Sequence, residues 1–194
     1  MGYFVDGLWQ EDVSRTKDGR FVRPPTSFRN FVTADGSPGP TGQEGFPAEA
    51  GRYHLYVSLA CPWAHRTLIF RKLKKLDDVI SVSIAQPLYG KTGWEFGTEP
   101  GATPDTVNGK STLAEIYLLA DAQYSGRVTV PVLWDKKRRI IVNNDYFNIR
   151  ICLCQNTVYC PTGILCFIIS RDYNADFIHL SLLSRMYSSK DFSQ

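Results

Sequence analysis

The sequence predicts an α/β sandwich preceded by an extended arm and followed by an irregular tail. A strand-like stretch at 52–58 leads directly into a helical pattern from Pro62, and a second strand follows at 79–85. A long connection then leads to a second helix, and two strands joined by a charged turn complete the pattern. The order β-α-β-α-β-β predicts parallel pairing of the first two strands and an antiparallel final pair.

The first 51 residues are expected to form the extended arm. They are rich in glycine, proline and polar residues, with turn or extended segments at 21–25 and 36–40. Spaced aromatic side chains suggest that the arm is pinned to the body of the protein in places, namely Phe21, Phe28, Phe31 and Phe46.

The central domain is predicted over residues 52–150. Its first helix should run from 62 to about 76, with apolar side chains on one face (Leu68, Ile69, Leu73 and Leu76). Its second helix should begin at the capping box Thr112-Leu-Ala-Glu115 and end near residue 123.

The connection at 86–108 is unusually long for a compact domain, and such loops are commonly functional or disordered. Trp94 and Phe96 within it favour a functional loop over the alternative that an aromatic residue pins it to the core.

The last two strands are predicted at 128–135 and 140–143. The four basic residues between them are interpreted as a hairpin tip rather than a nuclear signal. Pro131 stands at the head of its strand, where it cannot donate to a ladder. A cis bond there would turn the Val130 backbone toward an extended peptide ligand. The complete arrangement is thioredoxin-like, with Cys61 facing Val130 and Pro131.

Cys61 lies where the first strand turns into the first helix. Pro62 suits the first helical position, which makes Cys61 the N-cap. Unpaired N–H groups and the helix dipole favour a thiolate there. Ala64 occupies the position of a second redox cysteine, so the reaction would need an external thiol. The alternative is that Cys61 is simply a small buried residue.

Composition limits the other possibilities. A net charge of +3 among 194 residues does not indicate nucleic acid or a membrane surface as partner. No signal peptide or membrane-spanning run is predicted, which makes the cytosol the expected compartment. Of five cysteines, four crowd into the tail without zinc-site spacing, and neither a metal site nor a disulfide framework is expected.

Three stretches resemble the glutathionyl-hydroquinone reductases, the xi-class, omega-like glutathione transferases. They are the cysteine segment 51–66, the loop segment 87–96 and the strand 127–135, and the arm resembles the family's N-terminal extension. The resemblance implies the N-terminal domain fold of these transferases, with glutathione as co-substrate and glutathionyl-hydroquinones as substrates. It also implies a homodimer, although the family dimerises partly through regions without a counterpart here.

The family's site residues are carried over by motif. Cys61 would be the nucleophile that takes up glutathione as a mixed disulfide, and a second glutathione would release it. Trp94 and Arg127 would contact glutathione, and the Val130 backbone would pair with it. The family's Asn-Asn-Glu-Ser motif reads Asn-Asn-Asp145-Tyr146 here, which shortens the carboxylate and removes a small capping hydroxyl.

The tail at 151–194 has no resemblance to the family's C-terminal helical domain, and the match is expected to end near Asn144. We expect a tail of different origin, with one possible helix at 178–186. Three functions therefore stay open: a glutathionyl-hydroquinone reductase, a catalytically impaired thioredoxin-like domain, and a glutaredoxin-like enzyme that removes glutathione from mixed disulfides.

Overall fold

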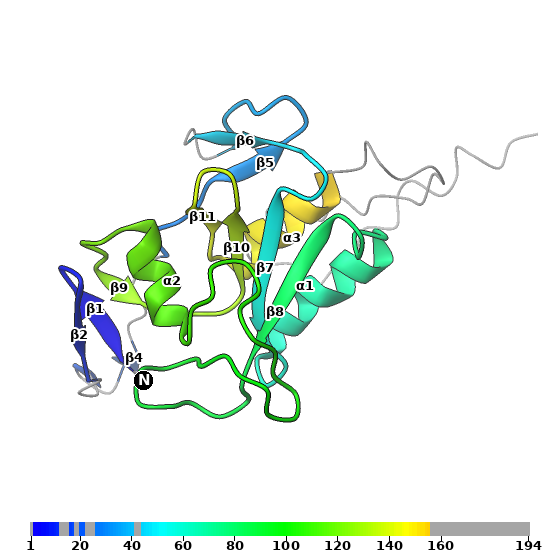
Figure 1. Ribbon diagram of the computed structural model, residues 1–194. Coiled ribbons are helices and arrows are strands. Elements are labelled where there is room, and N and C mark those ends of the chain that lie inside the picture. Colours follow the sequence, from blue (N-terminus) through cyan, green and yellow to red (C-terminus); the bar gives the residue numbers. More distant parts are fainter. Residues whose placement is uncertain (1, 12–15, 18–19, 22–25, 41–43, 156–194) are drawn as a thin grey trace, which may run out of the picture. The chain divides into compact units, whose positions relative to one another are not determined.

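The centre of the computed structural model is a four-stranded sheet with spatial order β11-β10-β7-β8 (Figure 1). β7 (Tyr53–Ser58) pairs in parallel with β8 (Ile80–Ala85) and antiparallel with β10 (Val132–Asp135). β11 (Ile140–Asn143) returns antiparallel to β10. The structure describes residues 2–11, 16–17, 20–21, 26–40 and 44–155. The predicted strand order is confirmed, and the four basic residues form the β10–β11 turn.

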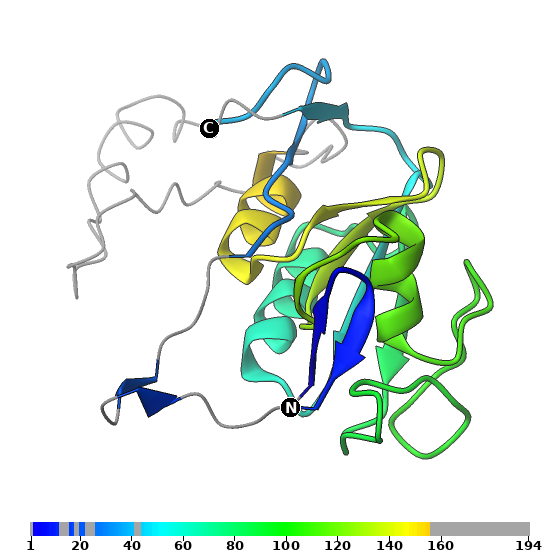
Figure 2. The same cartoon turned by 90° about the vertical axis from the view of Figure 1, so that its left-hand side faces the viewer.

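Helices cover both faces of this sheet. α1 (Pro62–Leu73) and α3 (Tyr146–Gln155) lie on one face, and α2 (Leu113–Ala120) covers the other (Figure 2). The predicted capping box at Thr112 is present. The predicted thioredoxin-like α/β class is confirmed.

α1 ends three residues earlier than predicted. Lys75 adopts a left-handed φ of 53°. Its N–H bonds the Lys72 carbonyl, and the Leu76 N–H bonds the Arg71 carbonyl. This is the Schellman arrangement, with lysine where glycine is usual. The predicted apolar face is only partly buried, since Ile69 and Leu73 are exposed.

α3 was not predicted, and it crosses the predicted domain limit between residues 150 and 151. Its buried residues Ile149, Cys152 and Leu153 follow helical spacing and pack against the sheet and β5. Asp145 supplies the N-cap, because its Oδ1 accepts the backbone N–H of Phe147 at 2.9 Å. The predicted helix at 178–186 lies outside the described residues.

The N-terminal segment contains strands and is not simply an extended arm. β1 (Tyr3–Val5) lies between β2 (Leu8–Gln10) and β9 (Gly126–Arg127) in a three-stranded sheet. β5 (Phe31–Thr33) pairs in parallel with β6 (Gly45–Pro47). A short hairpin joins Thr16–Lys17 (β3) to Arg20–Phe21 (β4).

The expected pinning of this segment holds for Phe31 and Phe46, both of which are buried, whereas Phe28 is half-buried. The side chain of Phe21 lies outside the described part. The segment therefore contributes to the core instead of lying over the surface.

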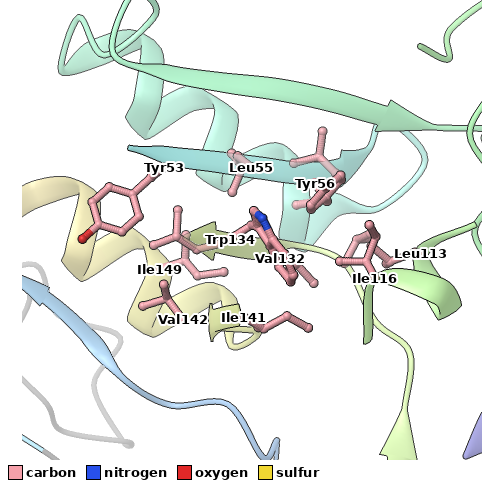
Figure 3. Packing of buried hydrophobic residues seen from close by; sticks show 14 of the residues in the cluster. Tyr53, Leu55, Tyr56, Leu113, Ile116, Val132, Trp134, Ile141, Val142 and Ile149 are labelled. Carbon is pink, nitrogen blue, oxygen red and sulfur yellow. The ribbon is translucent and has the colours of Figure 1, made fainter. Parts of the chain in front are cut away.

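The core fills the space between the sheet and its helices (Figure 3). All six residues of β7 are buried, as expected for a central strand covered on both faces. The main side chains of the core come from β7, β10, β11, α2 and α3. They include Tyr53, Leu55, Tyr56, Leu113, Ile116, Val132, Trp134, Ile141, Val142 and Ile149. Among the described helices, none is long and apolar enough to cross a membrane.

Candidate functional site

The predicted site residues converge at one end of the sheet. β7, β8 and β11 end there and β10 begins there, because Ser58 pairs with Ala85, Val132 with Tyr56, and Leu133 with Asn143. Functional side chains of open α/β sheets commonly lie outside the carboxyl ends of the parallel strands. Cys61, Val130 and Asp145 lie within three residues of these strand ends, and Trp94 follows the end of β8 by nine residues.

Cys61 occupies the N-cap of α1, and Pro62 follows at the first helical position. Its backbone N–H bonds the Ser58 carbonyl at 3.1 Å, which holds the turn between strand and helix. The residue is half-buried rather than enclosed in the core. Cys61 packs against the core cluster but is not fully buried, so the alternative of a simply buried cysteine does not describe it.

The cysteine sulfur lies 3.8 Å from the backbone carbonyl of Val130. A thiol can donate to this carbonyl, whereas a thiolate cannot. Cys61 accepts no capping hydrogen bond in its side chain, and the backbone N–H groups of Trp63 and Ala64 have no partner among the described residues. These two N–H groups are available to a negative sulfur.

The peptide bond between Val130 and Pro131 is cis. No hydrogen bond of the described part of the chain uses the Val130 N–H, and the Val130 carbonyl faces Cys61. A backbone with an unused donor beside the sulfur is suited to pairing with an extended peptide. β10 begins only at Val132, later than the predicted start at 128, since Pro131 cannot donate to the ladder.

Trp94 is brought to the same end by the connection between β8 and α2. Glu95 accepts the backbone N–H of Gln86 at 2.8 Å, directly after the end of β8. Trp94 is 6% exposed, and its ring packs against the tilted ring of Tyr89, with 4.2 Å between ring centroids. Its indole Nε1 is buried and has no hydrogen-bond partner among the described residues. A buried unpaired donor is costly, which marks Trp94 as a candidate ligand-binding residue.

Arg127 is held in β9 beside the N-terminal strand. It pairs with Tyr3 of β1, and its carbonyl accepts the Tyr124 hydroxyl at 2.9 Å. The half-buried residue lies three positions before Val130. Its guanidinium stays a predicted glutathione contact.

Asp145 has a role that the sequence did not indicate. One carboxylate oxygen, Oδ1, caps α3 through the N–H groups of Phe147 and Asn148. The other, Oδ2, accepts no hydrogen bond from a described residue. The cap that Tyr146 cannot supply comes instead from the preceding aspartate. One oxygen remains for the predicted contact with a ligand.

An aromatic cluster at the start of α1 and α3 was missed by sequence reasoning. The rings of Trp63 and Tyr146 lie 4.8 Å apart, and the Arg66 guanidinium lies 4.5 Å from the Trp63 centroid. The contact joins residues 83 positions apart, so no local pattern could reveal it. Because Trp63 is the second residue after Cys61, the N-termini of α1 and α3 lie side by side at the site.

A metal centre is not indicated. Among the described residues, no three His, Cys, Asp or Glu side chains gather as a ligand set. Cys152 is buried, and its sulfur accepts the backbone N–H of Val32 at 3.4 Å. Its role in the described structure is therefore to join α3 to β5.

Comparison with known proteins agrees with this geometry. The family model "Glutathione S-transferase, N-terminal domain" matches residues 60–155. The match extends through α3, which corrects the expectation that the resemblance ends near Asn144. α3 thus belongs to the thioredoxin-like domain.

Two known proteins illustrate the similarity. The glutathionyl-hydroquinone reductase YqjG of Escherichia coli (strain K12) is 58% identical over 148 residues, which cover 75% of this chain and 45% of that protein. Its glutathione-bound structure has a TM-score of 0.69 at 52% identity, covering 80% of this chain and 46% of that one. The Xi-class transferase of Natrialba magadii has a TM-score of 0.68 at 44% identity, covering 81% and 45%.

The chain thus spans about half the length of the relatives that it matches. The similarity covers the domain that carries the cysteine turn, the cis-proline bend and the α3 cap. Over its thioredoxin-like domain, the chain is therefore a homologue of the glutathionyl-hydroquinone reductases, the Xi-class glutathione transferases.

Proposed function

We propose that this protein is a glutathione-dependent thiol reductase that reduces glutathionyl-hydroquinones through a mixed disulfide between Cys61 and glutathione. The observation that carries the proposal is the position of the Cys61 sulfur, at the N-terminus of α1 and 3.8 Å from the carbonyl that precedes the cis-proline. We place the reaction in the cytosol, where thiols stay reduced.

The reaction has two steps. The Cys61 thiolate attacks the glutathionyl sulfur and forms an S–S bond, while the C–S bond to the ring breaks. The electron pair of that bond goes to the ring carbon, which takes up a proton and leaves as hydroquinone. The thiolate of a second glutathione then attacks the mixed disulfide, releasing glutathione disulfide and the Cys61 thiolate. Two glutathionyl sulfurs are oxidised, and the aryl carbon is reduced.

The binding roles follow the geometry. The Val130 backbone pairs with the cysteinyl unit of glutathione, since its N–H is unused and its carbonyl faces the sulfur. The indole N–H of Trp94 donates to a carboxylate of the tripeptide, which relieves its buried unpaired state. Arg127 supplies positive charge, and the free oxygen of Asp145 accepts from the γ-glutamyl ammonium group.

A second candidate is a glutaredoxin-like activity on protein–glutathione mixed disulfides. It is favoured by the exposure of the site, where Cys61 is half-buried and Trp63 is 42% exposed. The same Cys61–glutathione intermediate serves both reactions, and only the leaving group differs. The third candidate is a catalytically impaired thioredoxin-like domain that binds glutathione weakly or not at all.

The test compares hydroquinone release from a glutathionyl-hydroquinone with reduction of a small glutathionyl disulfide. We expect the intact chain to act on the first substrate and Cys61→Ser to lose at least about 1,000-fold in kcat/KM, since an alcohol does not replace a thiolate. Cys152→Ser is the matched control, because its hydroxyl still accepts from Val32, and it should stay within about threefold.

Activity on the disulfide alone would assign the glutaredoxin-like reaction instead. Absence of activity on either substrate would assign the impaired domain. Either result contradicts the proposed reductase.

A further inference from the structure

The opposite end of the sheet contains a pocket that the proposed thiol chemistry does not use. A cavity of about 690 Å³ lies between the start of β8, the loop before α2 and the β10–β11 turn. Its lining residues are Ser81, Thr106, Val107, Asn108, Lys136 and Arg139. Tyr53, the first residue of β7, pairs with Ile80 and Asp135 at this end, whereas Cys61 follows the last residue of β7. Figure 1 shows the β10–β11 turn and the β7–α1 connection at opposite ends of the sheet.

The pocket is polar and positively charged. Lys136 and Arg139 contribute two cations, and Ser81, Thr106 and Asn108 contribute hydrogen-bonding groups. No acidic side chain is among the lining residues. The two nearby buried carboxylates are already occupied: Asp105 accepts from the N–H groups of the loop, and Asp135 accepts from Arg52.

The four cations of the β10–β11 turn divide into two pairs. Lys137 forms an ion pair with Glu49, and Arg138 forms one with Glu44. Lys136 and Arg139 have no ion-pair partner in the described part of the chain. The paired cations attach the turn to the N-terminal segment, and the two unpaired ones border the cavity.

The backbone at Arg139 supports a role for its side chain. Arg139 adopts a left-handed φ of 55° at the end of the turn, where glycine or asparagine is favoured. Its N–H closes the turn on the Asp135 carbonyl at 2.9 Å. Arginine at this position carries a conformational cost and forms no ion pair with a described residue, so its guanidinium is available to a ligand.

The opposite wall is held in place. The Ser81 hydroxyl bonds the buried His54 ring at 2.7 Å, and the Asn108 amide bonds the Tyr56 hydroxyl at 2.9 Å. Both contacts link the pocket wall to the central strand β7. The side chains of Ser81 and Asn108 are therefore fixed in position, which lowers the entropic cost of ordering them on binding.

We propose that this pocket binds a phosphorylated small molecule. The Arg139 guanidinium and the Lys136 ammonium group contact the phosphate. The polar side chains of Ser81, Thr106 and Asn108 bind the rest of the molecule. Guanidinium and ammonium groups are the usual phosphate ligands, and the volume suits a molecule of nucleotide size. The site is independent of Cys61.

Isothermal titration of the full chain with AMP and with inorganic pyrophosphate tests the proposal. We expect saturable 1:1 binding of AMP that Arg139→Gly and Lys136→Gln each weaken at least about tenfold. Arg139→Gly should not lower the melting temperature, because glycine suits the left-handed backbone. Cys61→Ser should bind AMP as the wild type does.

The double variant Lys137→Gln/Arg138→Gln is the matched control, since it removes two charges from the same turn but none from the cavity. It should change AMP affinity less than about threefold. Absence of saturable AMP binding would overturn the proposal, and so would pyrophosphate binding without AMP binding. An equal loss in the control would also overturn it, because the effect would then be unspecific charge attraction.

Discussion

The two ends of the central sheet differ in how their polar groups are satisfied. At the end with Cys61, donors are left unused: the N–H groups of Trp63, Ala64 and Val130, and the indole of Trp94. At the other end, Asp135 and His54 are fully buried, and their polar atoms are engaged. The indole of Trp134 in β10 is an exception, since it too lacks a partner among the described residues. Unsatisfied donors beside Cys61 can be paired by a ligand, whereas the engaged groups of Asp135 and His54 stabilise the fold.

The largest expected effect is a loss of stability at the end of the sheet that contains Asp135. Arg52 bonds the buried Asp135 carboxylate through Nε at 3.0 Å, and the backbone N–H of Lys137 adds a further bond to it. Arg52→Met would leave this carboxylate buried without its cation, and we expect a loss of about 3–5 kcal/mol in the free energy of unfolding. Urea denaturation measures it.

The double variant Arg52→Met/Asp135→Leu should recover much of that loss, since it removes the buried charge together with its partner. Affinity for glutathione per folded molecule should not change in either variant. A single variant as stable as the wild type would show that the ion pair is not what anchors this end.

The next effect is a dependence of stability on pH. Burial lowers the pKa of His54 to about 4 from an ordinary value of 6.5. Between these values the unfolded chain binds more protons than the folded one, so stability falls as the pH falls from 6.5 to 4. At about 1.4 kcal/mol per pH unit, we expect a loss of about 3 kcal/mol from this histidine.

The control for His54 is His54→Gln, which can still bond Ser81 and Ser83 but does not titrate. Its unfolding free energy, measured by urea titration at several pH values, should decline less steeply than that of the wild type between pH 6.5 and 4. If the unfolding free energy fell equally steeply with pH in both proteins, titratable groups other than His54 would cause the acid sensitivity.

At the site end, Trp94→Phe should change binding rather than stability. The indole N–H has no partner to lose in the free protein, so the free energy of unfolding should stay within about 1 kcal/mol. The KM for glutathione should rise about tenfold, which corresponds to one lost hydrogen bond to a carboxylate.

Trp134 offers a matched control in the core. Its Nε1 is also buried and unpaired, but the residue lies in β10 beside His54. Trp134→Phe removes the same group and should leave the KM for glutathione unchanged. Equal KM values for the wild type and Trp94→Phe would remove the indole from the proposed binding site.

Local patterns predicted the centre of this fold well. The strands at β7, β8 and β11 and the capping box at Thr112 depend on neighbouring residues, so spacing and residue type were enough. The position of Cys61 at the N-cap followed in the same way from Pro62.

Contacts between distant residues could not be predicted from spacing. The strands of the N-terminal segment exist because β1 pairs with β9, more than 120 positions away. The ion pair of Arg52 with Asp135 joins two strands, and the stack of Trp63 on Tyr146 joins two helices. α3 was missed because its described residues include only three buried apolar side chains, those of Ile149, Cys152 and Leu153. Its cap is the aspartate that the motif assigned to ligand binding.

Asp145 caps α3 and is also proposed to contact glutathione. Separating these two roles gives the smallest expected effect. Asp145→Asn keeps a side-chain oxygen that can cap α3, so stability should change by less than about 0.5 kcal/mol. It removes the negative charge, and glutathione affinity should fall about threefold to tenfold if Oδ2 contacts the γ-glutamyl ammonium group. Asp145→Ala removes both functions and should also lose about 1 kcal/mol of stability. Titration calorimetry measures the affinity for glutathione, and urea denaturation measures the free energy of unfolding. Unchanged affinity in Asp145→Asn would limit this carboxylate to its capping role and place it with the saturated, fold-stabilising groups.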